Sequence, residues 1–323
     1  MKSGWHWRSD ILLKQFSRIF LSAVYGCAAS LLAFKADGFQ AISVVDDAKQ
    51  IVTLQQPAQR IVALAPSLTE LAYAAGAGDK LVAVSAYSDY PSSAKKLPQV
   101  SDAAGVSFEA LLALKPDLVL AWKSGNRASD LERIRGFGIP VFALEIEHMN
   151  DVPRALRNIG VLAGLTNPGE RAAVEFEQKI AALRNVSSAK SKISVFFEIS
   201  REPLMTVNRD HAISEVIRLC GGVNMFADVA PLVFVAPLEE LFRKQPNTII
   251  YTASEKREES PWPRYRGLMA WDAKRIYRVA SDPILRAGPR LAEGAAQVCA
   301  ALDKARQSLI KNETPSSAGV SKQ

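Results

Sequence analysis

The amino-acid sequence predicts an α/β protein built from two similar lobes with mainly parallel sheets. From residue 60 onward, short apolar runs alternate with helical patterns, which is typical of parallel strands joined by helices. A helix, a proline turn and an apolar strand then occur twice, at 109–120 and again at 239–250. Such a unit could recur by chance in an α/β chain. Its recurrence at this distance favours two lobes with a ligand cleft between them.

Glu109 and Glu239 open the two copies of this unit. Each carboxylate falls in the first turn of a short helix, where it is favoured by the helix dipole. A proline seven residues later ends each helix. Asp117 follows that proline in the first copy and Asn247 follows it in the second, and both precede an apolar strand.

The remaining elements are predicted from hydrophobic periodicity and from turn residues. In the first half, strands are expected at 60–64, 81–85, 117–122 and 141–144, and helices at 67–75, after Ser107, which is expected to cap the helix, and at 128–137. Ser67 and Glu70 have the spacing of a capping box at the start of the first helix. In the second half, strands are expected at 192–199, 248–252 and 275–280, and helices at 211–219, after Glu239 and at 289–309. The charged segment 255–266 is expected to be a surface loop, and 313–323 a disordered tail.

Between residues 151 and 186 the alternation stops and apolar residues recur at helical spacing. The pattern is broken only near 167–169. The segment could be a rigid connector between two lobes or two ordinary helices of a single domain. Its position between the two copies of the repeated unit favours the connector.

The first forty residues resemble an export signal. Four basic residues precede an uncharged apolar run at 19–34, which Lys35 closes. The run is slightly short for a membrane span, although an uncleaved anchor remains an alternative. Cys27 lies in an imperfect match to the site at which bacterial lipoproteins are acylated, so a lipid anchor is a further alternative.

Composition excludes several classes of protein. The chain has 323 residues, of which 48% are hydrophobic and 23% charged, so it can bury a sizeable core. Removal of residues 1–29 lowers the formal charge from +7 to +4. No dense basic run with interleaved aromatic residues is present, so a nucleic-acid partner is not expected.

The sequence offers little catalytic or metal-binding chemistry. It contains no His-x-x-x-His pair, glycine-rich phosphate loop, Gly-x-Ser-x-Gly elbow or Cys-x-x-Cys pair. Glu145, Glu147 and His148 could hold a metal, but solvated charges at a strand end explain them better. We therefore expect neither an enzyme nor a resident metal or cofactor. Outside the export signal, Cys220 and Cys299 could either close one disulfide loop or remain two buried thiols.

Amphipathic side chains follow three of the predicted strands. Tyr87 follows the strand at 81–85, Trp122 ends the strand at 117–122, and Asp282 and Arg286 lie in a predicted loop after the strand at 275–280. Ligands of open α/β sheets gather beyond the carboxyl ends of the strands. Aromatic faces with a few polar anchors suit a large, partly apolar ligand that has amide or hydroxyl edges.

Five segments of the sequence carry a more specific resemblance to a known family. They are Arg60-Ile-Val-Ala-Leu-Ala-Pro-Ser-Leu-Thr-Glu, Val84-Ser-Ala-Tyr-Ser-Asp-Tyr-Pro, Leu114-Lys-Pro-Asp-Leu-Val-Leu-Ala-Trp, Cys220-Gly-Gly-Val-Asn-Met-Phe and Ser281-Asp-Pro-Ile-Leu-Arg-Ala-Gly-Pro-Arg. Together they closely resemble the periplasmic cobalamin-binding proteins of ABC importers, over about residues 58–305 and in the same order. The wider family comprises helical-backbone binders of ferric siderophores, haem and cobalamin. The resemblance implies a non-enzymatic protein with two α/β lobes joined by one long helix and a ligand between them.

The resemblance also assigns residues. It implies ligand contacts by Tyr87, Trp122 and the segment Asp282, Pro283, Ile284, Leu285 and Arg286. It implies that Glu109 and Glu239 dock onto the permease, and that Cys220 and Cys299 form the family disulfide. The chain departs from the family at Ala103 and Val233, where relatives carry further tryptophans, and at the loosely aligned loop 228–237.

The expected organisation is therefore a signal region at 1–40, an N-terminal lobe at 55–150, a connecting helix segment at 151–187, a C-terminal lobe at 188–310 and a tail at 311–323. We expect an exported, periplasmic, monomeric protein that captures cobalamin or a related corrinoid and delivers it to a permease dimer. Haem or a ferric siderophore is the alternative ligand, with Tyr87 on the iron and Arg286 and Arg290 facing carboxylates. An exported hydrolase is the alternative from a different class.

Overall fold

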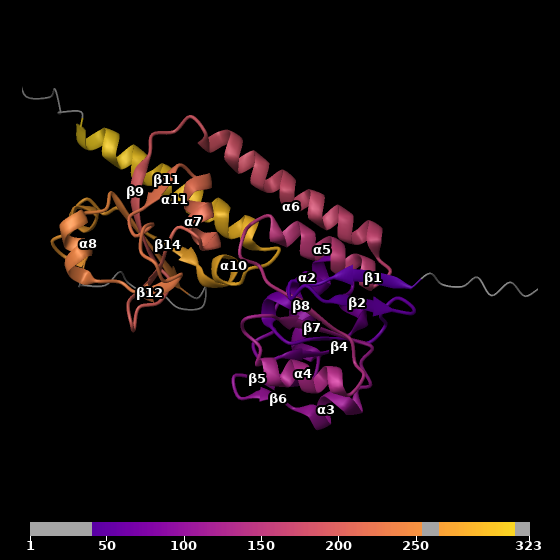
Figure 1. Ribbon diagram of the computed structural model, residues 1–323. Coiled ribbons are helices and arrows are strands. Elements are labelled where there is room, and N and C mark those ends of the chain that lie inside the picture. Colours follow the sequence, from indigo (N-terminus) through magenta and orange to yellow (C-terminus); the bar gives the residue numbers. More distant parts are fainter. Residues whose placement is uncertain (1–40, 254–264, 314–323) are drawn as a thin grey trace, which may run out of the picture. The chain divides into compact units, whose positions relative to one another are not determined.

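A computed structural model describes residues 41–253 and 265–313 of the protein (Figure 1). The expected export signal, with Cys27, lies outside these residues, as do most of the expected surface loop and nearly all of the expected tail. The described chain opens with an antiparallel hairpin of β1 (Ile42–Val45) and β2 (Ile51–Leu54), which the sequence pattern does not predict.

The N-terminal sheet has six strands in the order β6-β5-β4-β3-β7-β8. All pairings in it are parallel except that of β5 with β6 at the edge. The strands are β3 (Ile61–Ala63), β4 (Leu81–Ser85), β5 (Gln99–Asp102), β6 (Gly105–Val106), β7 (Leu118–Trp122) and β8 (Val141–Leu144). The helices between them are α2 (Pro66–Ala74), α3 (Phe108–Ala113) and α4 (Ala128–Gly136), with the short 3-10 turns η1 (Gly78–Lys80) and η2 (Ser92–Lys96).

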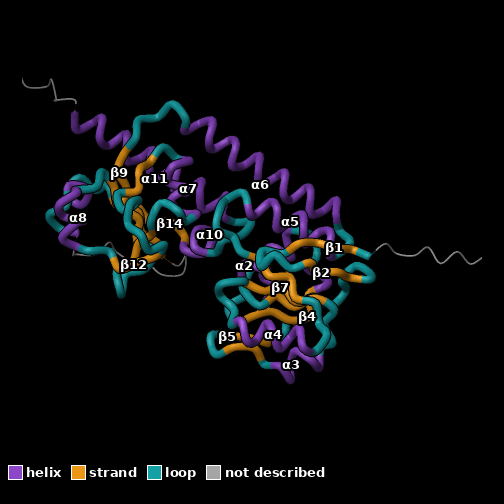
Figure 2. Tube along the Cα trace, in the orientation of Figure 1, coloured by secondary structure: helices purple, strands orange, loops and turns teal. Residues whose placement is uncertain are grey.

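The C-terminal sheet has four parallel strands in the order β11-β9-β13-β14. They are β9 (Ile193–Glu198), β11 (Gly222–Asn224), β13 (Thr248–Ala253) and β14 (Ile276–Ala280). A two-stranded antiparallel sheet joins β10 (Met205–Val207) to β12 (Val233–Val235). The helices are α7 (Ala212–Leu219), α8 (Leu238–Lys244), α9 (Met269–Asp272), α10 (Ser281–Leu285) and α11 (Leu291–Glu313). Figure 2 shows the alternation of helices and strands in both lobes.

The two sheets share the order of their central strands. In the first sheet β3 lies between β4 and β7, with β8 beyond β7, and in the second sheet β9 lies between β11 and β13, with β14 beyond β13. The predicted two-lobed α/β fold with mainly parallel sheets is thus confirmed.

The repeated unit is also the same at the level of the backbone. Lys115 and Gln245, which precede the two prolines, both have a left-handed backbone with φ of 46°. The Asp117 carboxylate accepts hydrogen bonds from the backbone N–H groups of Gln59 and Arg60, just before β3. The Asn247 side chain likewise accepts one from the backbone of Ser194 in β9. This turn therefore anchors β3 beside β7 in the N-terminal lobe and β9 beside β13 in the C-terminal lobe.

The helical segment between the lobes consists of two helices, α5 (Asp151–Leu162) and the longer α6 (Thr166–Ser187). The break falls at 163–165, before the predicted position, and Pro168 is accommodated in the first turn of α6, where a missing N–H costs nothing. The two helices approach closely at Gly160 and Gly169, where an added Cβ would lie 3.0 Å or less from opposing backbone atoms. Arg157 also pairs with Glu170 and Glu177 across the two helices.

Three other sequence predictions need correction. Ser67 and Glu70 do not form a capping box, because α2 begins at Pro66 and no side chain caps it. Ser107 occupies the N-cap position of α3 without a capping hydrogen bond. The segment after β14, predicted to be a loop, contains the short helix α10.

A single apolar cluster runs through both lobes and the helices between them. It includes Ile61 and Leu118 of the first sheet, Phe176 of α6, and Val195 and Ile250 of the second sheet. No helix in the described residues is long and apolar enough to span a membrane.

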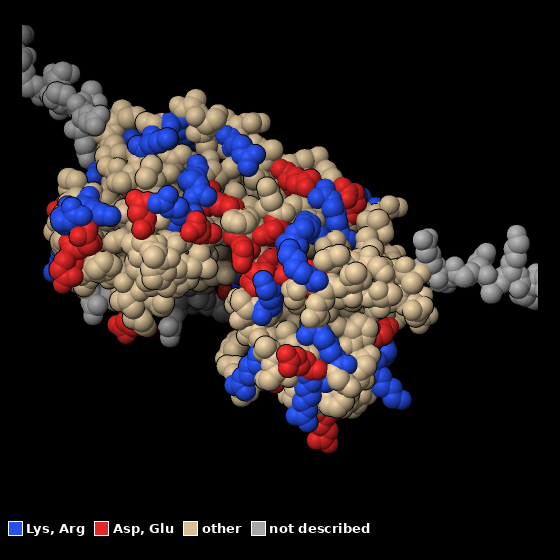
Figure 3. All heavy atoms as spheres, viewed as in Figure 1, with Lys and Arg blue, Asp and Glu red and all other residues tan. Residues whose placement is uncertain are grey.

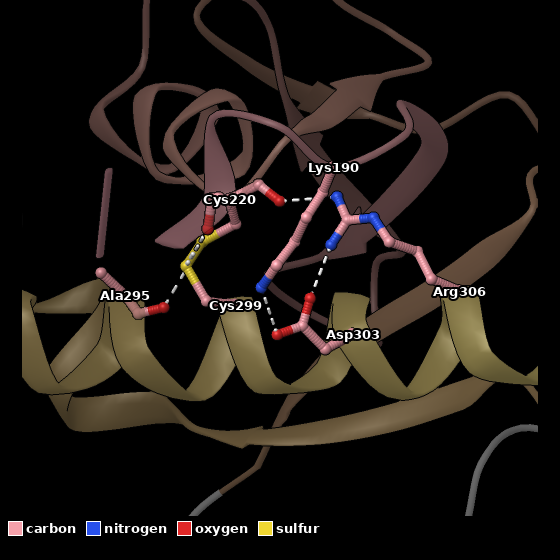
Figure 4. Close-up of a disulfide and its surroundings, with 7 residues drawn as sticks. Lys190, Cys220, Ala295, Cys299, Asp303 and Arg306 are labelled. Carbon is pink, nitrogen blue, oxygen red and sulfur yellow. Dashed lines mark hydrogen bonds and ion pairs between the residues drawn. A yellow bond between two sulfur atoms is a disulfide. The ribbon is translucent and has the colours of Figure 1, made fainter. Parts of the chain in front are cut away.

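Cys220 and Cys299 form a disulfide that joins the end of α7 to α11 (Figure 4). The surrounding polar groups are paired as well. Arg306 donates to the carbonyl oxygen of Cys220 at 2.7 Å and pairs with Asp303, which also binds Lys190. The predicted pairing is therefore confirmed, and it fixes the last helix to the C-terminal sheet.

Candidate functional site

Tyr87 lies just beyond the carboxyl end of β4, in an unusual backbone conformation. Its φ is 63°, a left-handed value that costs a non-glycine residue about 1 kcal/mol or more. Its side chain is nevertheless 80% exposed. A strained residue that presents an aromatic ring to its surroundings is a candidate for ligand contact rather than for core packing.

Trp122 ends β7 on the same edge of the N-terminal sheet and is 45% exposed. Its indole N–H donates to a carboxylate oxygen of Glu145 at 2.8 Å, and Glu145 also accepts from the backbone of Ser124. The ring covers Gly125, where an added Cβ would lie 2.0 Å from a ring atom. The ring is thus held in one orientation by its neighbours.

On the C-terminal lobe, α10 presents only part of the predicted ligand segment. The side chains of Pro283 and Ile284 are buried, whereas Asp282 and Leu285 are exposed. We use the name strand-end surface for Tyr87, Trp122, Asp282 and Leu285.

Beside this surface, one buried carboxylate connects the two lobes. Glu70 of α2 has a side chain that is only 1% exposed. It accepts a hydrogen bond from Arg286 at 3.2 Å and two from Arg290, at 2.8 and 2.6 Å. Arg286 also donates to Asp89 at 2.8 Å and lies 3.3 Å from Asp282.

These five residues, Glu70, Asp89, Asp282, Arg286 and Arg290, form a network that we call the arginine network. Three carboxylates surround two guanidinium groups, so their formal charges sum to −1. The Arg290 guanidinium also stacks on the ring of Tyr90, 4.0 Å from its centre. Both arginines are therefore committed to partners within the protein.

The pKa directions agree with this pairing. Burial alone would lower the pKa of Arg286, but the hydrogen bond to Asp89, the charge of Asp282 and the hydrogen bond to Glu70 raise it above its ordinary value. Burial alone would raise the pKa of Asp89, but its hydrogen bond from Arg286 and the charge of that arginine lower it. Arg286 and Asp89 are consequently both charged at neutral pH.

A hollow of about 380 Å³ lies next to the arginine network. It is lined by Glu70, Tyr90 and Arg290 together with side chains of α6 that include Phe176 and Lys179. Tyr87 and Trp122 do not line it.

The two predicted docking residues lie on short surface helices. Glu109 and Glu239 each fall in the first turn, of α3 and α8 respectively, and both are exposed. Neither carboxylate has a hydrogen bond or ion pair to another residue that the structure describes. On the face shown in Figure 3, basic and acidic side chains are interspersed rather than gathered into one basic surface.

The structure does not support a metal site at the end of β8, where Glu145, Glu147 and His148 lie. Glu145 binds Trp122 and Ser124, whereas His148 lies 2.6 Å from Glu215 of α7. Within residues 41–253 and 265–313, no group of three or more His, Cys, Asp and Glu side chains could hold a metal ion.

Sequence reasoning missed the central role of Glu70, because its spacing from Ser67 resembled a capping box. Asp89 and Arg290 were placed in motifs, and Arg290 was assigned to carboxylates of the alternative ligand, but neither was assigned a partner within the protein. The available signal was a pair of arginines, Arg286 and Arg290, at helical spacing near a proline-rich turn.

The fold and these side chains define a class: a two-lobed α/β protein that presents aromatic and polar groups at its strand ends for a ligand. Comparison with known proteins gives the family. Residues 61–281 match the family model described as "Periplasmic binding protein", and the chain belongs to that family.

Its curated relatives include proteins named "Vitamin B12-binding protein". The one from Pectobacterium carotovorum subsp. carotovorum is 38% identical over 246 residues, which cover 76% of this chain and 88% of the relative. The one from Vibrio parahaemolyticus is 34% identical, with coverage of 76% and 89%. The recognition made from sequence motifs is thereby confirmed.

Solved structures agree. The periplasmic vitamin B12 binding protein BtuF of Vibrio cholerae matches with a TM-score of 0.71 and 35% identity, over 78% of this chain and 99% of that one. The periplasmic haem-binding protein BhuT, solved with two haems, matches with a TM-score of 0.68 and 21% identity, over 77% and 99%. At that identity the second match shows a shared fold only.

Proposed function

We propose that this protein captures a corrinoid of the vitamin B12 type and delivers it to an inner-membrane ABC importer, without making or breaking a covalent bond. The similarity to vitamin B12-binding proteins supports the class of ligand. Exposed faces of Tyr87 and Trp122 would cover the apolar surface of the ligand, and Asp282 and Leu285 would contact it from the other lobe.

The arginine network is the observation that favours a corrinoid over haem. Vitamin B12 carries uncharged amide side chains, whereas haem carries two carboxylates. Arg286 and Arg290 already bind three carboxylates, so they have no net positive charge to offer to a fourth. The half-exposed carboxylates of Asp89 and Asp282 would instead accept hydrogen bonds from amide N–H groups.

Visible absorption titration of the purified protein tests this ligand class. Cyanocobalamin, haemin and a ferric hydroxamate siderophore are added separately, and retention of each is measured after gel filtration. We expect retention of cyanocobalamin with little change in its spectrum. Retention of haemin with a shifted haem band, and none of cyanocobalamin, would refute the proposal.

We further propose that Glu109 and Glu239 contact basic residues of the importer, one from each lobe. Their exposure, their lack of partners in the described part of the chain and their equivalent positions in the repeat support this role. In the same proposal, residues 1–40 direct export to the periplasm, and 55–150 and 188–310 are the lobes that the 151–187 segment joins.

Charge reversal tests the docking role. Glu109→Lys and Glu239→Lys should each leave corrinoid affinity unchanged and reduce corrinoid uptake in transport assays, because only the contact with the importer loses its complementary charge. Glu132→Lys on α4 is the matched control, since Glu132 is also an exposed helix carboxylate of the N-terminal lobe. Equal loss of uptake in all three variants would count against the assignment.

A further inference from the structure

We infer that Glu70 is a positioning residue: it fixes Arg286, on the opposite lobe, in the orientation needed for corrinoid binding. The inference rests on the proposed function, because Asp89 and Asp282, which Arg286 binds, are proposed ligand contacts. Glu70 itself is buried and would not contact the ligand.

The position of the Glu70 carboxylate is set by the core of the N-terminal lobe. Leu68, Leu71 and Ala72 of the same helix are buried, so α2 cannot turn about its axis without exposing apolar surface. The neighbouring Thr69 hydroxyl donates to Ser88, in the loop that carries Tyr87 and Asp89. The helix and the loop therefore present Glu70 and Asp89 as one rigid pair of acceptors.

Arg286 is held by this pair and by its own helix. One of its terminal nitrogens, Nη1, donates to both Glu70 and Asp89, and the other faces Asp282. Arg290 donates one hydrogen bond to each oxygen of Glu70. Because a planar guanidinium with several acceptors has few allowed orientations, loss of Glu70 should change where Arg286 points.

The arrangement makes a ligand contact of one lobe depend on a buried charge of the other lobe. Neutralising Glu70 leaves two partly buried arginines with the two more exposed aspartates as their carboxylate partners. Arg286 would then turn toward Asp89 and Asp282, and those carboxylates would accept fewer hydrogen bonds from ligand amides.

A double-mutant cycle tests the inference. Corrinoid affinity is measured by calorimetry for the unaltered protein, Glu70→Gln, Arg286→Ala and the double variant, and thermal unfolding is followed for all four. We expect Glu70→Gln to weaken cyanocobalamin binding about tenfold when Arg286 is present and by less than twofold when it is absent. The thermal shift of Glu70→Gln should persist in both backgrounds, because in both the substitution removes the carboxylate that Arg290 binds.

Glu293→Gln is the matched control, since Glu293 is an exposed carboxylate at the start of α11 that lines the hollow beside Glu70. It should leave the affinity unchanged. If Glu70→Gln does not fold, Glu70→Asp replaces it in the cycle, because the shorter side chain moves the carboxylate away from Arg286 and Arg290.

An equal loss of affinity in both backgrounds would overturn the inference, as would no loss in either. These outcomes differ from failure of the proposed function, in which the unaltered protein itself would not bind cyanocobalamin.

Discussion

The two lobes share a scaffold but differ at their strand ends. Both contain four strands in the same order. Both also use a left-handed residue, a proline and an Asp or Asn to anchor the strand that comes first along the chain, β3 or β9. In the N-terminal lobe, β7 ends in the exposed Trp122, whereas β13, its equivalent, ends in the buried Ala253. The repeated unit therefore accounts for the scaffold that the two lobes share, whereas the residues at the strand ends differ between them.

The same comparison separates two kinds of carboxylate. Glu109 and Glu239 occupy equivalent positions and remain exposed in both lobes. Glu70 occurs in the N-terminal lobe and binds arginines of the C-terminal lobe. Equivalent residues thus suit contact with a symmetrical partner, while residues unique to one lobe determine how the lobes meet each other and the ligand.

The disulfide of the C-terminal lobe should give the largest difference in stability between the lobes. Replacing both cysteines, Cys220→Ser and Cys299→Ser, should lower the free energy of unfolding by about 2–4 kcal/mol, because the unfolded chain is no longer cross-linked. Calorimetric unfolding measures the change. Reductant should lower the melting temperature of the unaltered protein and not that of the variant; an equal effect on both would contradict the role of the bond.

Trp122→Ala tests the difference between the ends of β7 and β13. Corrinoid affinity should fall about tenfold, because an oriented aromatic face is lost. Phe137→Ala is the control, since Phe137 is also a half-exposed aromatic residue of the N-terminal lobe but follows α4. If titration calorimetry shows equal losses for both variants, the strand-end surface does not bind the ligand.

Asp117→Ala and Asn247→Ala test the shared part of the scaffold. Each should destabilise the protein by about 1 kcal/mol, because backbone N–H groups of the adjoining strand lose their acceptor. Asp117→Asn should cost less, since asparagine, the residue at the equivalent position 247, retains one acceptor oxygen. Chemical denaturation measures all three, and a much larger effect in one lobe would show that the two turns are not equivalent.

The smallest expected difference concerns the first helix of each lobe. The ring of His211 caps α7 by accepting a hydrogen bond from the N–H of Ile213, whereas no side chain caps α2. Burial lowers the pKa of His211 below its ordinary value of 6.5. Between that value and the lower folded pKa, the unfolded chain binds a proton that the folded protein does not, so stability falls as the pH drops below 6.5.

His211→Asn should retain the cap and remove this dependence. Denaturation at pH 7 and pH 5 should therefore show a smaller loss of stability for the variant than for the unaltered protein. His148, which pairs with Glu215 on the same helix, is present in both proteins and so cancels from the comparison. An identical pH dependence would contradict the role of His211.

Local sequence signals predicted much of the fold. The strands at 81–85 and 141–144 have the predicted bounds, because each is a short apolar run between turn residues. The helix α10 was missed because five residues that include a proline show no helical period. Glu70 was misread because its partners lie 216 and 220 residues away, and no local pattern reports such a pairing.

The most direct test of the account is calorimetric titration of the purified protein with cyanocobalamin and, separately, with haemin. We expect saturable binding of cyanocobalamin with one ligand per chain, and no comparable binding of haemin, because the arginine network has no free positive charge. Tight binding of haemin together with no binding of cyanocobalamin would contradict it.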